Sequence, residues 1–125
     1  MTQRKPPIYD PAKLIEAISK WPSPLIDKKH NLSIYVEGRA RSNQSRIDHI
    51  VEYGHDLKAR DLCLIPDGIK NYMAYKKDPN YKDTYNYYIK RGGEDKGLIK
   101  VSIQIDGEDS TRAWIKTIFI TYNIK

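Results

Sequence analysis

The stretch GLIKVSIQIDG, residues 97–107, decides the fold class because its apolar side chains recur at every second position. The apolar positions are Ile99, Val101, Ile103 and Ile105, and the polar positions between them are Lys100, Ser102 and Gln104. Such an alternation predicts a strand with one face packed on a core and the other face toward solvent.

The segments on either side extend this strand into a sheet. Two tyrosine-rich strands are predicted at residues 72–77 (YMAYKK) and 84–90 (TYNYYIK). Residues 112–124 (RAWIKTIFITYNI) are apolar on both faces, which predicts a central strand. The turn signals RGGEDKG and DGEDS separate the last three runs. We therefore expect a four-stranded, or slightly larger, antiparallel meander sheet.

Helices are predicted before this sheet. DPAKLIEAISKW, residues 10–21, begins with Asp10 as a helix N-cap. A short strand, LSIYVEG, is predicted at residues 32–38, and RIDHIVEYGHDL, residues 46–57, predicts a helix that ends at Gly54. The fold class is therefore α+β, with N-terminal helices packed on the meander sheet.

A chain of 125 residues suits one domain. We expect residues 45–122 to form its core and residues 1–44 to be an N-terminal extension with a helix and a short strand. A short helical piece is expected at residues 57–64. The only cysteine, Cys63, excludes an intramolecular disulfide, and its apolar setting, LCLI, predicts a buried thiol.

The charge balance favours an anionic partner. The chain has 22 Lys and Arg against 16 Asp and Glu, a formal net charge of +6, and the basic residues are spread along the whole sequence. This favours nucleic acid over a membrane surface, although a merely soluble basic protein has the same composition. No stretch is long and apolar enough to cross a bilayer. We expect no membrane association and a cytoplasmic location, in the producing cell or in a target cell.

The motifs point to acid–base chemistry without a metal. The sequence has no cysteine pair, no HExxH motif and no glycine-rich phosphate loop, so we expect no metal and no cofactor. His49 and His55 lie six positions apart, and histidine is the side chain that can donate or accept a proton near neutral pH. Metal-free RNA cleavage needs a base, an acid and a cation. The candidate cations are Lys90, Arg91 and Lys100, and the candidate hydroxyl donors are Thr117, Thr121 and Tyr122.

Structural roles remain alternatives at each of these positions. His55 follows the expected helix end, where a histidine often caps the last carbonyls. His49, beside two acidic neighbours, also suits an exposed helix surface. Lys100 also suits the solvated face of a strand. His30, in the connector DKKHN, is expected at the surface.

The succession RIDHIVEYGHDL, LIPDGIK, YYIKR, GLIKVSIQI and TIFITY resembles the phage-associated branch of the barnase/EndoU/colicin/RelE-like (BECR) nucleases. The resemblance covers about residues 45–122. It implies a metal-independent endoribonuclease of the toxin type. It also implies roles for individual residues: His49 and His55 as acid and base, Lys90 or Arg91 together with Lys100 as the phosphate clamp, and Thr121 as a hydroxyl donor.

The expected partner is RNA, tRNA among the candidates, together with an immunity or antitoxin protein. The loop GRARSNQ, residues 38–44, departs from the BECR family pattern because it is unusually basic. Arg39 and Arg41 of this loop and Arg46 after it are candidates for substrate binding, with Thr117 and Tyr122. The alternative function is a non-catalytic basic module that binds nucleic acid or protein, as a phage-encoded inhibitor would.

Overall fold

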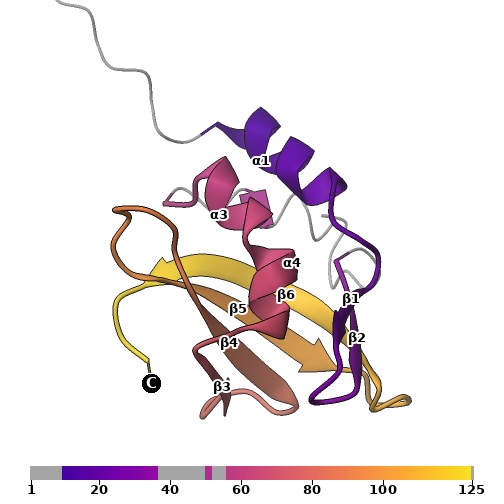
Figure 1. Cartoon of the computed structure of the whole chain (residues 1–125). Helices are drawn as coiled ribbons and strands as arrows, with labels where there is room; N and C mark the ends of the chain where they lie inside the picture. The colour runs from indigo at the N-terminus through magenta and orange to yellow at the C-terminus, as the bar shows by residue number, and fades with distance from the viewer. Residues whose placement is uncertain (1–9, 37–49, 52–55, 125) are drawn as a thin grey trace, which may run out of the picture.

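A six-stranded sheet covered by helices on one face organises the chain (Figure 1). The computed structural model describes residues 10–36, 50–51 and 56–124. Within these ranges the elements are α1 (Pro11–Ser19), β1 (Leu25–Asp27), β2 (Leu32–Tyr35), α3 (Ala59–Cys63), α4 (Ile65–Lys70), β3 (Ala74–Lys77), β4 (Thr84–Lys90), β5 (Leu98–Ile105) and β6 (Arg112–Thr121). None of the helices among these described residues is long and apolar enough to span a bilayer.

The sheet is mixed, with the strand order β1-β2-β6-β5-β4-β3. Strands β3 to β6 form the expected antiparallel meander, but β2 pairs with β6 in parallel and β1 pairs with β2 in antiparallel. The α+β class is therefore confirmed, and the four-stranded antiparallel sheet describes only part of a larger mixed sheet. The physical reason lies in the edges of β6: the meander pairs one edge, with β5, and β2 pairs with the other, so that its backbone N–H and C=O groups are not left open there.

Most local predictions agree with these elements. Asp10 caps α1 by accepting a hydrogen bond of 3.3 Å from the backbone N–H of Lys13. Strand β1 was not expected, because three residues are too few to show alternation inside a turn-rich connector. Of the helix expected over residues 46–54, only Ile50 and Val51 are described, and both are helical and buried.

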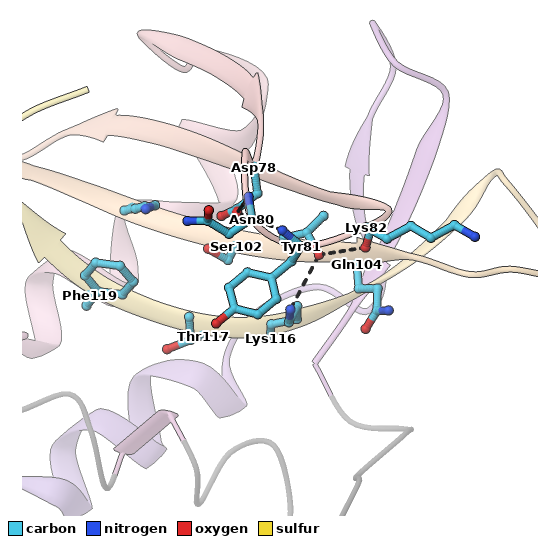
Figure 2. Close-up of a pocket in the computed structure, with 11 residues that line it drawn as sticks. Asp78, Asn80, Tyr81, Lys82, Ser102, Gln104, Lys116, Thr117 and Phe119 are labelled. Atoms are coloured by element: carbon cyan, nitrogen blue, oxygen red, sulfur yellow. Dashed lines mark hydrogen bonds between the residues drawn. The ribbon is translucent and has the colours of Figure 1, made fainter. Parts of the chain in front are cut away.

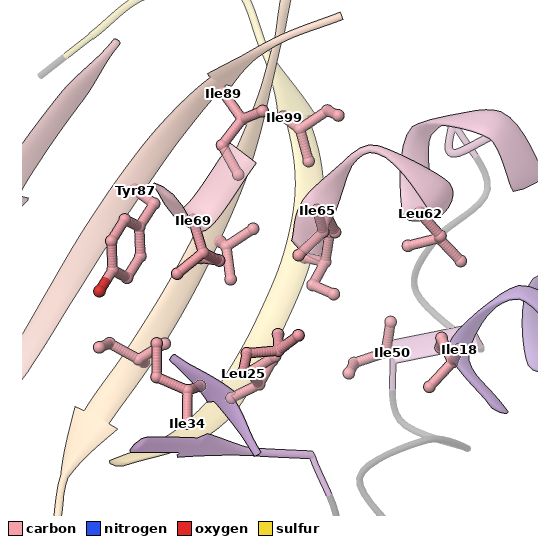
Figure 3. Packing of buried hydrophobic residues seen from close by; sticks show 14 of the residues in the cluster. Ile18, Leu25, Ile34, Ile50, Leu62, Ile65, Ile69, Tyr87, Ile89 and Ile99 are labelled. Atoms are coloured by element: carbon pink, nitrogen blue, oxygen red, sulfur yellow. The ribbon is translucent and has the colours of Figure 1, made fainter. Parts of the chain in front are cut away.

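The hydrophobic core lies between the helices and one face of the sheet (Figures 1 and 3). Ile99, Val101 and Ile103 are fully buried there, as the alternation of residues 97–107 predicts. The helices contribute apolar side chains to the same cluster: Leu14, Ala17, Ile18, Leu62, Ile65 and Ile69. The expectation of a buried Cys63 is wrong, since the helical turn that buries its neighbour Leu62 leaves Cys63 exposed.

Gly68 allows α4 to approach β4 closely. A Cβ atom at Gly68 would lie 2.5 Å from Cγ2 of Ile89, which is inside van der Waals contact. We expect Gly68→Ala to destabilise the fold by about 1–3 kcal/mol through overpacking, despite the better helix propensity of alanine. Urea unfolding measures the change. Gly107→Ala is the matched control, because nothing lies within 4 Å of its added Cβ; equal effects of the two substitutions would contradict the close packing.

Candidate nucleic-acid interface

The face of β4, β5 and β6 opposite the helices carries polar and aromatic side chains, and we call it the polar sheet face. Backbone pairing aligns these side chains in rows across the strands. One row contains Asn86, Ser102 and Thr117, and the next contains Tyr88, Lys100 and Phe119. The pairing of β5 with β6 shifts between Ser102 and Ile103. Lys116 is the extra residue at this bulge, which explains why Lys116 and Thr117 both lie on the polar sheet face.

The loop between β3 and β4 covers one end of this face. Asp78 anchors the loop, because its carboxylate accepts hydrogen bonds from the backbone N–H groups of Asn80 and Tyr81 at 2.8 and 3.2 Å. It also accepts a 3.1 Å bond from the Asn86 amide. Burial would raise the pKa of Asp78, but these three hydrogen bonds, with the charge of Lys100, hold the pKa below its usual value. Asp78 is therefore ionised at neutral pH and is committed to holding the loop.

A pocket of about 580 Å³ lies between this loop and the polar sheet face (Figure 2). Figure 2 shows the rings of Tyr81 and Phe119 on the pocket side of the loop and of β6. Tyr81 is 62% exposed, and the amino group of Lys116 lies 4.4 Å from the centre of its ring. The pocket is lined by Asp78, Asn80, Tyr81, Lys82, Thr84, Lys100, Ser102, Gln104, Lys116, Thr117 and Phe119.

The charge of this pocket is positive. Lys82, Lys100 and Lys116 line it against a single carboxylate, that of Asp78. The amino group of Lys100 lies 5.1 Å from the ring centre of Phe119, and that of Lys116 lies 3.4 Å from Oγ1 of Thr84. Ammonium groups beside exposed rings can bind phosphate groups while bases stack on the rings. The arrangement is therefore suited to a single-stranded nucleic acid.

Two of the candidate residues from the sequence, Lys100 and Thr117, line this pocket. Lys90 and Thr121 lie on the same sheet face but one row further along, since both are paired with Leu98. Lys90 is exposed, and the hydroxyl of Thr121 donates to the backbone carbonyl of Asn123. Tyr122 follows β6 and is exposed.

Arg91, a candidate phosphate ligand, is instead part of a buried ion pair. Its Nε and one terminal nitrogen donate to the two oxygens of Asp61 at 2.9 and 2.8 Å. Its other terminal nitrogen donates to the carbonyl of Lys96 at 2.7 Å. The bond to Asp61 raises the pKa of Arg91. All three nitrogens of the guanidinium are thus engaged by the protein, which corrects the expectation of a clamp at this position.

Five candidates lie outside the described residues: His49, His55, Arg39, Arg41 and Arg46. His30 lies at the surface only in part: 29% of its side chain is exposed, and its ring contacts Asp27 and Tyr75.

The sequence reasoning missed the loop residue Tyr81 and the lysines Lys82 and Lys116. Tyr81 and Lys82 lie in the segment DPNYKD, residues 78–83, whose proline and aspartates are typical of a turn between two strands. Lys116 lies in the segment 112–124, which the sequence predicts to be apolar on both faces, and the bulge places its side chain on the polar sheet face. Four basic or aromatic residues within the seven positions 76–82 of this hairpin, Lys76, Lys77, Tyr81 and Lys82, would have been the available signal for the loop.

Among residues 10–36, 50–51 and 56–124, no three His, Cys, Asp or Glu side chains are grouped so as to hold a metal ion. Comparison with protein-family models, with curated proteins and with solved structures returned no match to the chain.

Proposed function

We propose that this protein is a metal-independent endoribonuclease that binds RNA on the polar sheet face. The observation that carries the proposal is the pocket of about 580 Å³ in which three lysines and two exposed rings surround hydroxyl and amide groups. Lysines neutralise the phosphate backbone, and rings stack on unpaired bases. The net charge of +6 acts in the same direction by attracting a polyanion.

The proposed reaction is an internal transesterification. A base removes the proton of a ribose 2′-hydroxyl, and the 2′-oxygen then forms a bond to the neighbouring phosphorus. The bond from phosphorus to the 5′-oxygen breaks, and an acid protonates that oxygen. The products are a 2′,3′-cyclic phosphate and a 5′-hydroxyl. Lys100 and Lys116, which line the pocket, would stabilise the negative charge on the non-bridging oxygens of the pentavalent intermediate, and Thr117 would donate a hydrogen bond to one of these oxygens.

His49 and His55 are the proposed acid and base, and Arg39, Arg41 and Arg46 are proposed to extend the RNA contact. These five residues lie outside the described ranges, so the proposal for them rests on the sequence. The BECR type of fold and a toxin role with an immunity or antitoxin protein belong to the same proposal. The four-stranded antiparallel unit β3 to β6 supports the BECR part.

Cleavage of RNA in the presence of EDTA tests this function. The protein is incubated with a pool of total RNA in EDTA and, separately, in Mg²⁺, and the new 3′ ends are examined for cyclic phosphate. We expect cleavage in both conditions. Intact RNA in both conditions would show that the protein is not a ribonuclease.

The RNA-binding part of the proposal has its own test. We expect Lys100→Ala to weaken single-stranded RNA binding about three- to tenfold, and to lower the slope of log affinity against log salt by about 0.7, because one phosphate contact is lost. Fluorescence anisotropy over a salt series measures both values. Lys13→Ala, an exposed lysine on α1, is the control with the same charge change. If both variants change affinity equally, the polar sheet face is not the RNA site.

A non-catalytic binding module is the second candidate function. Among the described residues that line the pocket, none is a histidine, and lysines, amides and rings suit holding a strand more than transferring protons. RNA that binds in a Lys100-dependent manner but stays intact would favour this module.

A further inference from the structure

The polar sheet face continues beyond the pocket, toward the start of β6. Ala113 and Ile115 are fully buried in the core, so the alternation of the strand directs Arg112 and Trp114 to the opposite face. Gln104, which lines the pocket, is the register partner of Trp114. Trp114 is therefore the next side chain on this face after the end of the pocket.

Trp114 belongs to a compact cluster of its own. Tyr35 of β2 is its register partner on the other side, and the two ring centres are 5.4 Å apart. The guanidinium carbon of Arg112 lies 5.7 Å from the centre of the Trp114 ring. Nε of Arg112 donates to Oδ2 of the buried Asp106 at 2.8 Å, and a terminal nitrogen lies 2.7 Å from the same oxygen. The ion pair thus holds the guanidinium in place beside two half-buried rings.

The combination of one ring with one cation recurs along β6. Among the described residues of this face, the pairs are Arg112 with Trp114, Lys116 with Tyr81, and Lys100 with Phe119, with the cation 5.7, 4.4 and 5.1 Å from the ring centre. Strand β6 contributes at least one member to each pair, and Figure 2 shows Lys116, Thr117 and Phe119 following one another along it. Trp114 and Phe119 are roughly 15 Å apart along the strand, at the usual rise per residue. The pairs therefore form one row.

We propose that Tyr35, Arg112 and Trp114 form a second base-binding subsite, outside the pocket, for the same RNA strand that the pocket binds. This inference rests on the proposed function. The RNA strand runs along β6, with one base at each ring–cation pair. Bases stack on aromatic rings and on guanidinium planes alike. Contacts between lysines and exposed rings are weak, so Lys100 and Lys116 can turn to the phosphates when bases take the rings.

Charge decides the order in which the two subsites fill. The carboxylate of Asp106 pairs with Arg112, whereas the pocket has three lysines and one carboxylate. The second subsite therefore contributes stacking more than charge. A ligand too short to reach both subsites binds in the pocket, and a longer strand also contacts Trp114.

The fluorescence of Trp114 tests this subsite directly. The chain has two tryptophans, and the other, Trp21, lies on the helix side, where its Nε1 donates to the carbonyl of Leu62 at 2.8 Å. Trp21→Phe leaves Trp114 as the only tryptophan. The probes are a dinucleotide and a hexanucleotide of 2′-O-methyl RNA, which lack the 2′-hydroxyl that the proposed cleavage needs. We expect the hexanucleotide at saturation to quench Trp114 emission by a base stacked beside it, and the dinucleotide to quench it far less.

Substitutions of Trp114 measure the same contact as affinity. Trp114→Leu is expected to weaken hexanucleotide binding about five- to hundredfold, because one stacked base is lost, and to change dinucleotide binding by less than about twofold. Trp114→Phe retains a ring, so most of the affinity for the hexanucleotide should return. Damage to the fold would instead weaken the binding of both probes. Fluorescence anisotropy of labelled oligonucleotides gives these values.

The outcomes separate this subsite from the function on which it rests. Bound hexanucleotide with unchanged Trp114 emission, or equal affinity of the wild-type chain and Trp114→Leu, would overturn the subsite and leave RNA binding at the pocket intact. An equal loss for both probes in Trp114→Leu would also overturn it. Failure of the wild-type chain to bind either probe would overturn the RNA-binding function and the subsite together.

Discussion

Asp61→Ala is expected to lower the free energy of unfolding by about 3–5 kcal/mol, because it leaves the buried guanidinium of Arg91 with only the more distant carboxylate of Asp95, at 3.9 Å, as counter-ion. Asp61 is fully buried and Arg91 is 9% exposed. The two side chains form parallel hydrogen bonds of 2.9 and 2.8 Å. Asp61 also accepts a 2.9 Å bond from the backbone N–H of Lys58 at the start of α3. The substitution therefore removes a helix-terminus bond together with the ion pair.

Urea unfolding followed by circular dichroism measures this effect. Asp67→Ala is the matched control, since Asp67 is an exposed aspartate in the first turn of α4, and we expect a change below about 1 kcal/mol. Asp61→Leu combined with Arg91→Met should be less destabilising than Asp61→Ala, because no buried charge is left unpaired. An effect of Asp61→Ala no larger than that of Asp67→Ala would refute this account of the ion pair.

The second large effect is expected for His55→Ala, which should reduce RNA cleavage about 10²- to 10⁴-fold through loss of general acid–base catalysis. RNA affinity should stay within about tenfold of the wild-type value, because phosphate binding is assigned to the lysines of the polar sheet face. Cleavage of a labelled RNA at saturating protein concentration, in EDTA, isolates the rate from the affinity.

Added imidazole separates catalysis from structure for the same variant. Imidazole should restore part of the cleavage by His55→Ala, since it can replace the missing acid or base, and a purely structural role of His55 would give no rescue. His49→Ala is expected to lose activity to a similar extent, with the pH–rate profile losing one of its two limbs. Unchanged cleavage by His55→Ala, or a loss that follows a lowered melting temperature, would contradict the assignment.

The strands were predicted well because their signal is local. The alternation in residues 97–107 and the two-sided apolar character of residues 112–124 depend only on neighbouring side chains. The strand positions are confirmed: β5 buries Ile99, Val101 and Ile103, and β6 is central, between β2 and β5. The outer face of β6 is not apolar, however, because it carries Lys116 and Thr117. The candidate site was predicted in part, since Lys100 and Thr117 line the pocket whereas Arg91 does not.

The remaining features depend on segments that are distant along the chain. In the sequence Arg91 is a cation available to RNA, but in the fold it pairs with Asp61, which lies thirty positions away along the chain. The sequence places His30 at the surface, but its ring is partly buried because it stacks on Tyr75, which comes from a distant strand. Neither contact leaves a periodic trace in the sequence.

The amino-acid sequence by itself determined the α+β class, the meander of β3 to β6, the cap of α1 and the basic character of the surface. These follow from periodicity, turn chemistry and charge, which act between near neighbours. Tertiary structure alone decided the parallel pairing of β2 with β6 and the bulge that places both Lys116 and Thr117 on the polar sheet face. It also decided which cations line a pocket, as Lys100 does, and which form a buried ion pair, as Arg91 does. The reason is that strand pairing and desolvation depend on which distant segments the folded chain brings into contact. A charged side chain is available to a ligand only where the fold does not bury it beside a counter-ion.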